Sequence, residues 1–240
     1  DSIARQYKAN VITHTRVASV DAAAKTVTTQ DGGCAAYDKI LVTTGATAFV
    51  PGSFASLKGA FCMRTVDDAV KLHDAIAKRD YKDAVIVGAS MVGIKVAELL
   101  HKRGCHVTLA DMAPHIFALA AYPEVSEMIE ARLEKMGIDM VFGKAIAGAV
   151  EHTDAGGNIT GTTVQLADGS AIETELLVLN IGTRAATGIL DPQQIHIERG
   201  IVVDERMRTS AEGIYAAGDC CQGNNLQYGQ TQIIGLWANA

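Results

Sequence analysis

The stretch Ala84–Asp111, AVIVGASMVGIKVAELLHKRGCHVTLAD, carries the strongest pattern in this chain of 240 residues. Its first four residues form an apolar run that predicts a buried strand, and this run ends at Gly88. Residues 92–103 have apolar side chains at helical spacing, and Gly104 after them is typical of a helix end. Residues 106–110 predict a second strand. The stretch therefore predicts a βαβ unit, which is the building block of α/β folds.

The six residues between the first strand and the helix, GASMVG, match the turn of a dinucleotide-binding unit. Gly88 permits the tight turn and Gly93 permits close packing of helix on strand. A pyrophosphate is expected at the helix start, beside Ser90, Met91 and Val92, because free N–H groups and the positive end of the helix dipole meet there. Ser90 replaces the usual middle glycine, but it is small and its hydroxyl could donate to phosphate. Such a motif alone can also be a tight turn that binds nothing.

Asp111 stands at the end of the second strand, about twenty residues after the turn. An acid at this place accepts hydrogen bonds from the adenosine ribose hydroxyls. The 2′-phosphate of NADP(H) would meet a carboxylate there, and the following residues 112–115 (MAPH) offer no Arg to pair with it. The sequence therefore predicts that NAD(H) is preferred over NADP(H).

The rest of the chain is read mostly as short strands and amphipathic helices. Buried strands are indicated by apolar runs and helices by apolar residues that recur at helical spacing. The expected elements are a short helical N-terminal end, strands at 11–13, 17–20, 25–29 and 39–44, a tight turn at 31–33, helices at 67–79 and 124–136, a strand at 138–142, hairpins with turns at 154–158 and 168–169, and a buried strand at 176–181.

Two further motifs flank the nucleotide motif. The first is Tyr37–Gly45, YDKILVTTG, and the second is Thr209–Asp219, TSAEGIYAAGD. With these motifs in this order, the chain resembles the flavin-dependent pyridine nucleotide-disulfide oxidoreductases, in which a nicotinamide-binding domain is inserted into a flavin-binding domain. The resemblance implies an α/β fold: a Rossmann-like NAD-binding domain with a β-hairpin insertion, inserted into an incomplete FAD-binding domain.

The resemblance also implies cofactor-binding roles for residues of the flanking motifs. In this family the strand that leads to Thr44 and Gly45 lies close to the flavin. Asp219 would hydrogen-bond the ribityl chain of FAD, and Gly218 would let the cofactor pass close to the backbone. An acid after such a glycine can also be an ordinary helix N-cap. Gly182, in the segment Gly182-Thr183-Arg184, matches the family's segment at the close of the nicotinamide domain.

The resemblance sets the domain boundaries and the expected state of the cofactors. Residues 1–60 and 186–240 are expected to be two parts of an FAD domain, and residues 61–185 the NAD(H) domain. No strand, glycine-rich turn and helix precede Tyr37, so FAD is expected in the intact protein and absent from this chain. The tail from Gly229 is similar to the start of a helix that leads to a dimer-forming domain, so the intact protein is expected to be a homodimer.

Composition excludes several classes of partner. The net charge of -6 and pI near 5.6, without a basic cluster, argue against nucleic acid, and no apolar run approaches the roughly 20 residues that span a bilayer. The five cysteines form neither a CxxC pair nor a metal-ligand spacing, so no metal site is expected. A cytoplasmic protein that binds small-molecule cofactors is predicted.

Three functional hypotheses follow. The first is the central part of an FAD-dependent NADH oxidoreductase, which passes hydride from NADH to flavin and on to a disulfide, oxygen or an electron-carrier protein. The second is a nucleotide-binding module that is catalytically inert as the chain stands. The third is an NAD-dependent dehydrogenase without flavin. No catalytic residue is identified. Lys95, where many family members have Glu, is either a solvated helix residue, which we favour, or a cation that replaces the role of that acid.

Overall fold

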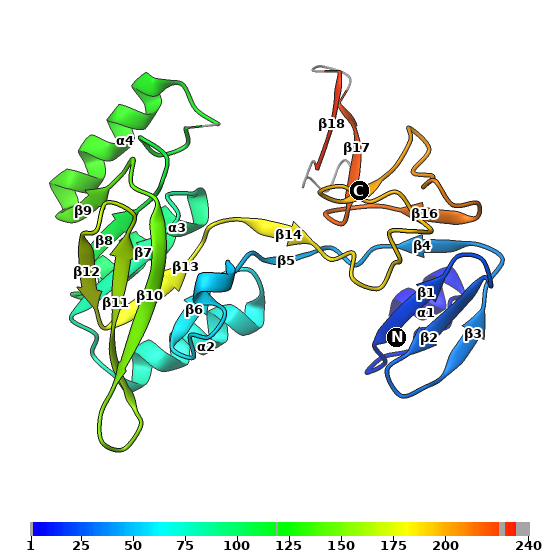
Figure 1. Ribbon diagram of the computed structural model, residues 1–240, viewed down its shortest axis with the longest axis horizontal. Coiled ribbons are helices and arrows are strands. Elements are labelled where there is room, and N and C mark those ends of the chain that lie inside the picture. Colours follow the sequence, from blue (N-terminus) through cyan, green and yellow to red (C-terminus); the bar gives the residue numbers. More distant parts are fainter. Residues whose placement is uncertain (1, 119, 226–228, 234–240) are drawn as a thin grey trace. The chain divides into compact units, whose positions relative to one another are not determined.

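The computed structural model of the chain describes residues 2–118, 120–225 and 229–233 (Figure 1). The contacts divide the chain into two units. Unit 1 consists of Asp1–Thr47 and Arg184–Ala240, and unit 2 consists of Ala48–Thr183. Unit 2 is therefore an insertion in the sequence of unit 1. The chain passes between the units along β5 (Ala46–Ala48) and β14 (Thr183–Ala185), and these two strands pair with each other.

The centre of unit 2 is a parallel sheet in which the order of the strands is β6-β13-β7-β8-β9, so β13 inserts between strands that precede it in the sequence. The strands are β6 (Ala60–Cys62), β7 (Asp83–Val87), β8 (His106–Ala110), β9 (Ile138–Val141) and β13 (Leu176–Leu179). Parallel strands are buried on both faces, which explains their continuous apolar runs.

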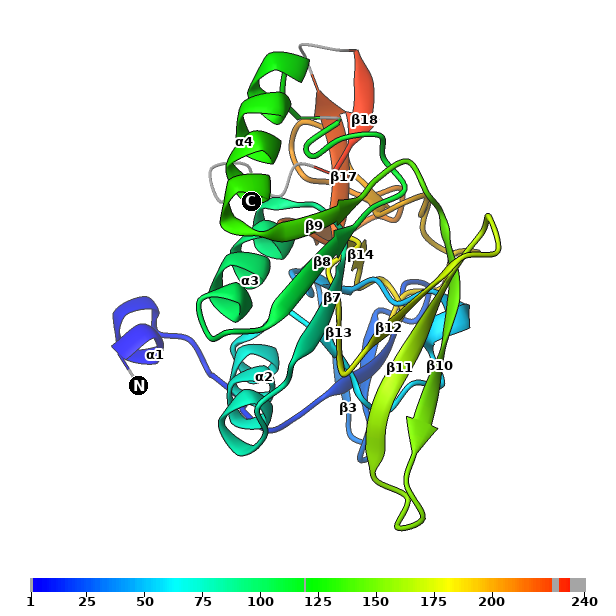
Figure 2. The same cartoon turned by 90° about the vertical axis from the view of Figure 1, so that its left-hand side faces the viewer.

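Different layers cover the two faces of this sheet. Helices α2 (Val66–Lys78), α3 (Met91–His101) and α4 (Pro123–Met136) lie on one face, and the antiparallel strands β10 (Ile146–Thr153), β11 (Ile159–Leu166) and β12 (Ala171–Thr174) lie on the other (Figure 2). Strand β13 shows the alternation. Leu176 and Val178 pack among the helices, whereas Leu177 and Leu179 pack with Phe54 and Val164 on the other face.

The ends of two helices in unit 2 are determined by capping interactions and by residues that favour a helix end. At the start of α2 the Thr65 hydroxyl accepts from the backbone N–H of Asp68 at 3.1 Å, and the Asp68 carboxylate accepts from the N–H of Thr65 at 2.9 Å. Helix α4 starts with Pro123 and ends at Gly137, whose φ is 82°. Of the helices in the described parts of the chain, none is long and apolar enough to cross a membrane.

Unit 1 combines residues from both ends of the chain in one core. Its elements are α1 (Ser2–Tyr7), an antiparallel sheet of β1 (Val17–Asp21), β2 (Thr26–Thr29) and β3 (Cys34–Ala36), a parallel pair of β4 (Ile40–Val42) and β16 (Ile214–Ala216), and a sheet of β15 (Ile201–Val202), β17 (Cys221–Asn225) and β18 (Gln230–Gln232). Val20 and Val42 pack with Ile201 and Ile214. The early and late segments therefore fold together, as expected of a domain interrupted by an insertion.

The α/β fold class and the elements around the nucleotide motif are confirmed, and two expectations for unit 1 are wrong. Residues 11–13 form no strand, and the side chains of Val11 and Ile12 are exposed. Strand β3 was not expected. Gln230–Gln232 is a strand rather than a helix, because it pairs with β17. The remainder of the expected C-terminal helix, residues 234–240, lies outside the described residues.

The first boundary between the units lies after Thr47, earlier than residue 60, where the sequence suggested it. Phe54 belongs to the short 3-10 helix η1 (Gly52–Phe54), is 3% exposed and packs with Val85 and Leu177. The Glu151 carboxylate accepts from the backbone N–H of Lys58 at 2.8 Å. Residues 48–60 therefore belong to unit 2. The second boundary, after Thr183, lies within two residues of the expected one.

We predict that Phe54→Ala lowers the free energy of unfolding of unit 2 by about 3–5 kcal/mol, because it leaves a cavity among packed side chains. The matched control is Val50→Ala, in the same segment but 38% exposed, for which the change should stay within about 1 kcal/mol. Urea titration followed by far-ultraviolet circular dichroism measures both. Equal small effects would show that residues 48–60 are not part of the unit 2 core.

Candidate functional site

The turn after β7 is built from two glycines that a side chain would disrupt. Gly88 has a φ of +107°, and a Cβ there would lie 2.3 Å from the carbonyl oxygen of Asn180. A Cβ on Gly93 would lie 1.9 Å from the carbonyl oxygen of Gly88. Both distances are far below van der Waals contact. The glycines thus have the roles that the sequence predicted for them, a tight turn and a close seat for α3.

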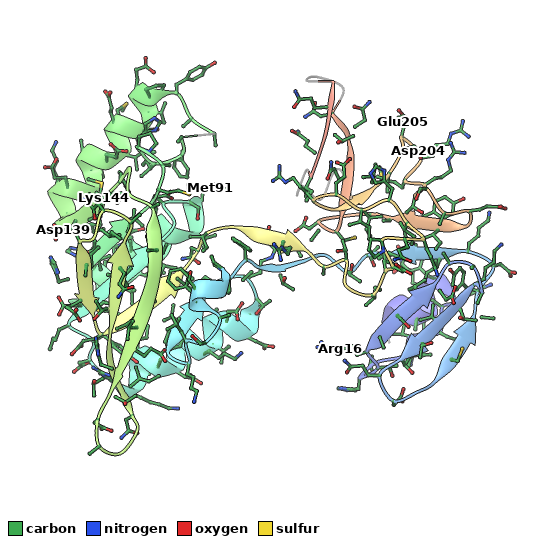
Figure 3. The ribbon with its side chains drawn as sticks, viewed as in Figure 1. Arg16, Met91, Asp139, Lys144, Asp204 and Glu205 are labelled. Atoms are coloured by element: carbon green, nitrogen blue, oxygen red, sulfur yellow. The ribbon has the colours of Figure 1, made fainter. Side chains whose placement is uncertain are left out.

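Helix α3 starts with Ser90 as its N-cap. The Ser90 hydroxyl oxygen accepts from the backbone N–H of Gly93 at 3.3 Å, which is the ordinary capping interaction. Met91 and Val92 follow as the first helical residues, with exposures of 76% and 44%, and Figure 3 shows Met91 at this end of α3. The first N–H groups of a helix have no partner within it. Donors at the start of α3 can therefore meet an anionic ligand.

Asp111 connects the end of β8 to the glycine turn. Its carboxylate accepts from the N–H of Ala89 at 2.7 Å and from the N–H of Ala113 at 2.9 Å. The sequence predicted the place of this acid but not its bond to the turn. A carboxylate offers about four acceptor positions, so two bonds leave room for ribose hydroxyls.

A cavity of about 360 Å³ opens at the carboxyl ends of these strands. Four residues expected from the sequence line it together: Gly88, Ser90, Asp111 and Gly182. The other expected residues of this motif, Met91, Val92 and Gly93, do not line it. The rest of the wall is mostly apolar and comprises Phe49, Pro51, Phe54, Val87, Met112, Ile146, Asn180 and Ile181.

Most residues of this wall could not be predicted from local sequence patterns. Phe49 and Phe54 come from the connector that leads into unit 2, and no local pattern distinguishes them. Asn180 had a signal that could have been used, because it is a polar residue directly after the buried apolar run Leu176–Leu179. Such a residue at the carboxyl end of a parallel strand lies where α/β proteins bind ligands.

In unit 1 the two flanking motifs meet. Strands β4 and β16 pair in parallel, with Ile40 opposite Ile214, and the N–H of Ala217 donates to the carbonyl of Val42 at 3.0 Å beyond the strands. Since parallel strands end at the same edge, Thr44 and Gly45 follow one strand end, and Gly218 and Asp219 follow the neighbouring one. Gly45 and Gly218 have φ values of 68° and 80°.

The first of these motifs is tied to the segment that re-enters unit 1. The Thr44 hydroxyl donates to the carbonyl of Ala186 at 2.6 Å, and the N–H of Ala186 donates to the carbonyl of Gly45 at 2.9 Å. A cavity of about 830 Å³ lies beside this connection, lined by residues 40–44, Thr47, residues 184–189, Arg16, Val17 and Val20. Thr44 lines it, whereas Gly45, Gly218 and Asp219 do not.

The profile of the pyridine nucleotide-disulphide oxidoreductases matches residues 2–240. The chain belongs to this FAD-dependent family. The resemblance drawn from the three motifs is thereby confirmed. The description of the family names oxidoreductases that use a pyridine nucleotide.

Curated relatives of this chain include two NAD(+) reductases. The chain is 29% identical over 219 residues to rubredoxin-NAD(+) reductase of Pseudomonas putida, covering 90% of the chain and 54% of the relative. It is 33% identical over 222 residues to the nitric oxide reductase FlRd-NAD(+) reductase of Escherichia coli, covering 92% and 56%. The chain spans about half the length of the curated relatives it matches.

Solved structures show the same fold. A ferredoxin reductase of Rhodopseudomonas palustris superposes with a TM-score of 0.85 at 26% identity, covering 98% of this chain and 56% of that one. The water-forming NADH oxidase of Lactobacillus brevis, bound to NADH, gives a TM-score of 0.87 at 25% identity, covering 98% and 52%. The Rossmann-like architecture expected from the sequence is confirmed.

The five cysteines are free thiols in this structure. Cys220 and Cys221 are buried, and their thiols donate to the carbonyls of Val42 and Gly218. Burial raises the pKa of the Cys221 thiol, which makes it less reactive. In the described part of the chain there is also no group of three or more His, Cys, Asp or Glu side chains that could hold a metal ion.

Lys95 lies on the solvent side of α3. Its side chain is 62% exposed, and its Nζ is 2.9 Å from Glu98, whose other oxygen pairs with Lys102 at 2.5 Å. Lys102 and Lys95 together lower the pKa of the Glu98 carboxyl to about 2. Lys95 therefore has a partner on its own helix.

We predict that Lys95→Glu leaves the affinity for NADH unchanged within about threefold, because Lys95 pairs with Glu98 and does not line the cavity. Isothermal titration calorimetry measures the affinity. The matched control is Lys102→Glu, which removes the other cation from Glu98. A loss beyond about tenfold, or 1.4 kcal/mol, in the first variant alone would show that Lys95 contacts the nucleotide.

Proposed function

We propose that this chain is the nicotinamide-binding part, with a portion of the flavin-binding part, of an FAD-dependent NADH oxidoreductase that passes hydride from NADH to flavin and on to an electron acceptor. The observation that carries this proposal is the convergence of Gly88, Ser90, Asp111 and Gly182 on one cavity at the carboxyl edge of the parallel sheet. Ligands of open α/β sheets bind at this edge.

The residues of unit 2 fit a dinucleotide. At Gly88 and Gly93 a side chain would collide with backbone, so both glycines are needed for the tight turn and for the close approach of α3 that a dinucleotide turn requires. The start of α3 supplies N–H donors and positive dipole charge. Asp111 accepts from the ribose hydroxyls while it holds the turn through Ala89. The chain thus binds and orients the nucleotide.

The residues of unit 1 fit one side of a flavin site. Gly45 and Gly218 have positive φ values and present bare backbone at neighbouring strand ends, where a cofactor can pass closely. Asp219 follows as an acceptor for hydroxyl groups of the ribityl chain. Bound FAD would supply the redox chemistry, which the protein only positions. No residue of the chain is assigned to acid–base catalysis.

An electron-carrier protein is the acceptor that the relatives favour. The curated proteins named above are reductases of rubredoxin and of the FlRd component, and the first solved structure is a ferredoxin reductase. Oxygen is a second candidate, because the NADH oxidase has a TM-score of 0.87. An inert nucleotide-binding module is the alternative for this chain by itself. The homodimer and the cytoplasmic location expected from the sequence stay predictions.

The first test concerns the choice of nucleotide. We expect the chain to bind NADH at least about tenfold more tightly than NADPH, because the Asp111 carboxylate repels a 2′-phosphate. Asp111→Asn keeps an oxygen for the bond from Ala89 but removes the charge, so it should narrow the difference. Titration calorimetry with both nucleotides measures it.

The matched control for that test is Asp139→Asn. Asp139 belongs to β9, and Figure 3 shows it far from Met91 at the start of α3. This variant should keep the wild-type preference. NADPH binding as tight as NADH binding by the wild type, or an Asp111→Asn variant with an unchanged ratio, would contradict the role of Asp111.

The second test concerns the flavin. We expect the purified chain to retain no stoichiometric FAD and to oxidise no NADH, because in this family the adenosine diphosphate half of FAD binds a glycine-rich βα turn that no residues before Tyr37 supply. Visible absorbance after gel filtration and an NADH oxidation assay measure both properties. Flavin at a one-to-one ratio, or steady turnover, would overturn this prediction.

A further inference from the structure

The segment that follows β8 passes the nucleotide cavity before it leads into α4. Its first two residues, Asp111 and Met112, line that cavity. The N–H of Ala113 donates to the Asp111 carboxylate at 2.9 Å, and the carbonyl of Ala113 accepts from the N–H of Gly143, beyond β9, at 2.8 Å. The orientation of the Asp111 carboxylate therefore depends on where the following residues of this segment lie.

Two side chains of α4 hold the far end of the segment. The Glu130 carboxylate accepts from the backbone N–H of Ile116 at 2.9 Å, and the Ser126 hydroxyl donates to the carbonyl of Ile116 at 2.7 Å. Ile116 and Ser126 are each 0% exposed. Buried backbone groups outside helices and strands need such side-chain partners. A single helix thus satisfies both polar groups of the Ile116 backbone.

The next residue, Phe117, has a backbone conformation that its own sequence disfavours. Its φ is 50°, in the left-handed region that a bulky side chain rarely adopts. The side chain of Phe117 packs against the core on the helix face of the sheet. A backbone of this kind persists only where its surroundings impose it. The path of residues 111–117 is therefore imposed by contacts with α4 and the core.

This path matters for the choice of nucleotide. Asp111 uses one oxygen for the N–H of Ala113 and the other for the N–H of Ala89, so both bonds set the direction of its remaining acceptor positions. A shift of the segment would turn the carboxylate away from the ribose hydroxyls. NADPH has a phosphate in place of the 2′-hydroxyl, so its affinity depends less on this orientation. A loosened segment should therefore weaken NADH binding more than NADPH binding.

We propose that Glu130 and Ser126 are positioning residues for nucleotide selectivity: by holding Ile116 they keep the Asp111 carboxylate in the orientation that favours NADH over NADPH. This proposal rests on the proposed function of the same site. Neither side chain is among the described residues that line the cavity, so both act through the segment. Glu130 is the stronger tie, because Nδ1 of His115 lies 3.3 Å from the Ile116 carbonyl and stays there when Ser126 is lost.

The test compares NADH and NADPH on the full chain by titration calorimetry. Glu130→Ala should lower the ratio of the two affinities by about fivefold, mainly through weaker NADH binding, and Ser126→Ala should lower it by about two- to threefold. Glu130→Gln keeps an oxygen that accepts from Ile116, so it should keep the wild-type ratio. The matched control is Glu127→Ala, exposed on the same helix, which should change neither affinity.

The ratio separates positioning from a merely structural role. A variant that folds only in part loses affinity for both nucleotides equally, because the same competent fraction binds each of them, and its ratio stays constant. A constant ratio in Glu130→Ala and Ser126→Ala therefore overturns the proposal while nucleotide binding stands. A fall in Glu130→Gln as large as that in Glu130→Ala also overturns it, since the charge of Glu130 rather than its bond to Ile116 would then set the preference.

Two results for the wild type bear on the proposed function. A chain that binds both nucleotides equally overturns the role of Asp111 and this proposal together. A chain that binds neither nucleotide overturns the proposed function as well.

Discussion

The close contact between the start of α3 and the end of β7 controls the arrangement of unit 2. Gly93 lies so near the carbonyl of Gly88 that a methyl group would overlap it. This approach fixes where the helix dipole ends, and it leaves Ala89 in reach of Asp111. Gly88 is confined on its other side by Asn180. The ends of β7, β8 and β13 lie side by side because Val87 is in register with Ala110 and Leu179, and the cavity opens at these ends.

Most of this turn could be predicted from the sequence because its causes are local. The apolar run before Gly88, the helical spacing after it and the acid at position 111 lie within one stretch, and each follows from a nearby backbone requirement. The N-cap bond of Ser90 was not foreseen, because the sequence was compared with a motif that has glycine there. The structure gives Ser90 a capping role that any such helix start favours.

The other half of the cavity could not be predicted because distant segments build it. Phe54 reaches the sheet from a connector, and its burial depends on Val85 and Leu177, far along the chain. The insertion of β13 between β6 and β7 is likewise a pairing between remote segments, which no local periodicity encodes. The boundary of unit 2 was misplaced for the same reason. The place of Asn180 could be predicted in part. Its polarity after a buried strand is evident in the sequence, but the residues around it come from distant segments.

The pairing of β5 with β14 bears on how this architecture can arise. The N–H of Phe49 donates to the carbonyl of Gly182 at 3.0 Å, so the first and last residues of unit 2 are nearly in contact. A segment whose ends meet in this way can be exchanged with little disturbance of the host, because a short hairpin turn could join the same two positions. Unit 2 therefore has the form of an insertable domain, and a single insertion or deletion in the gene could add or remove the whole of it.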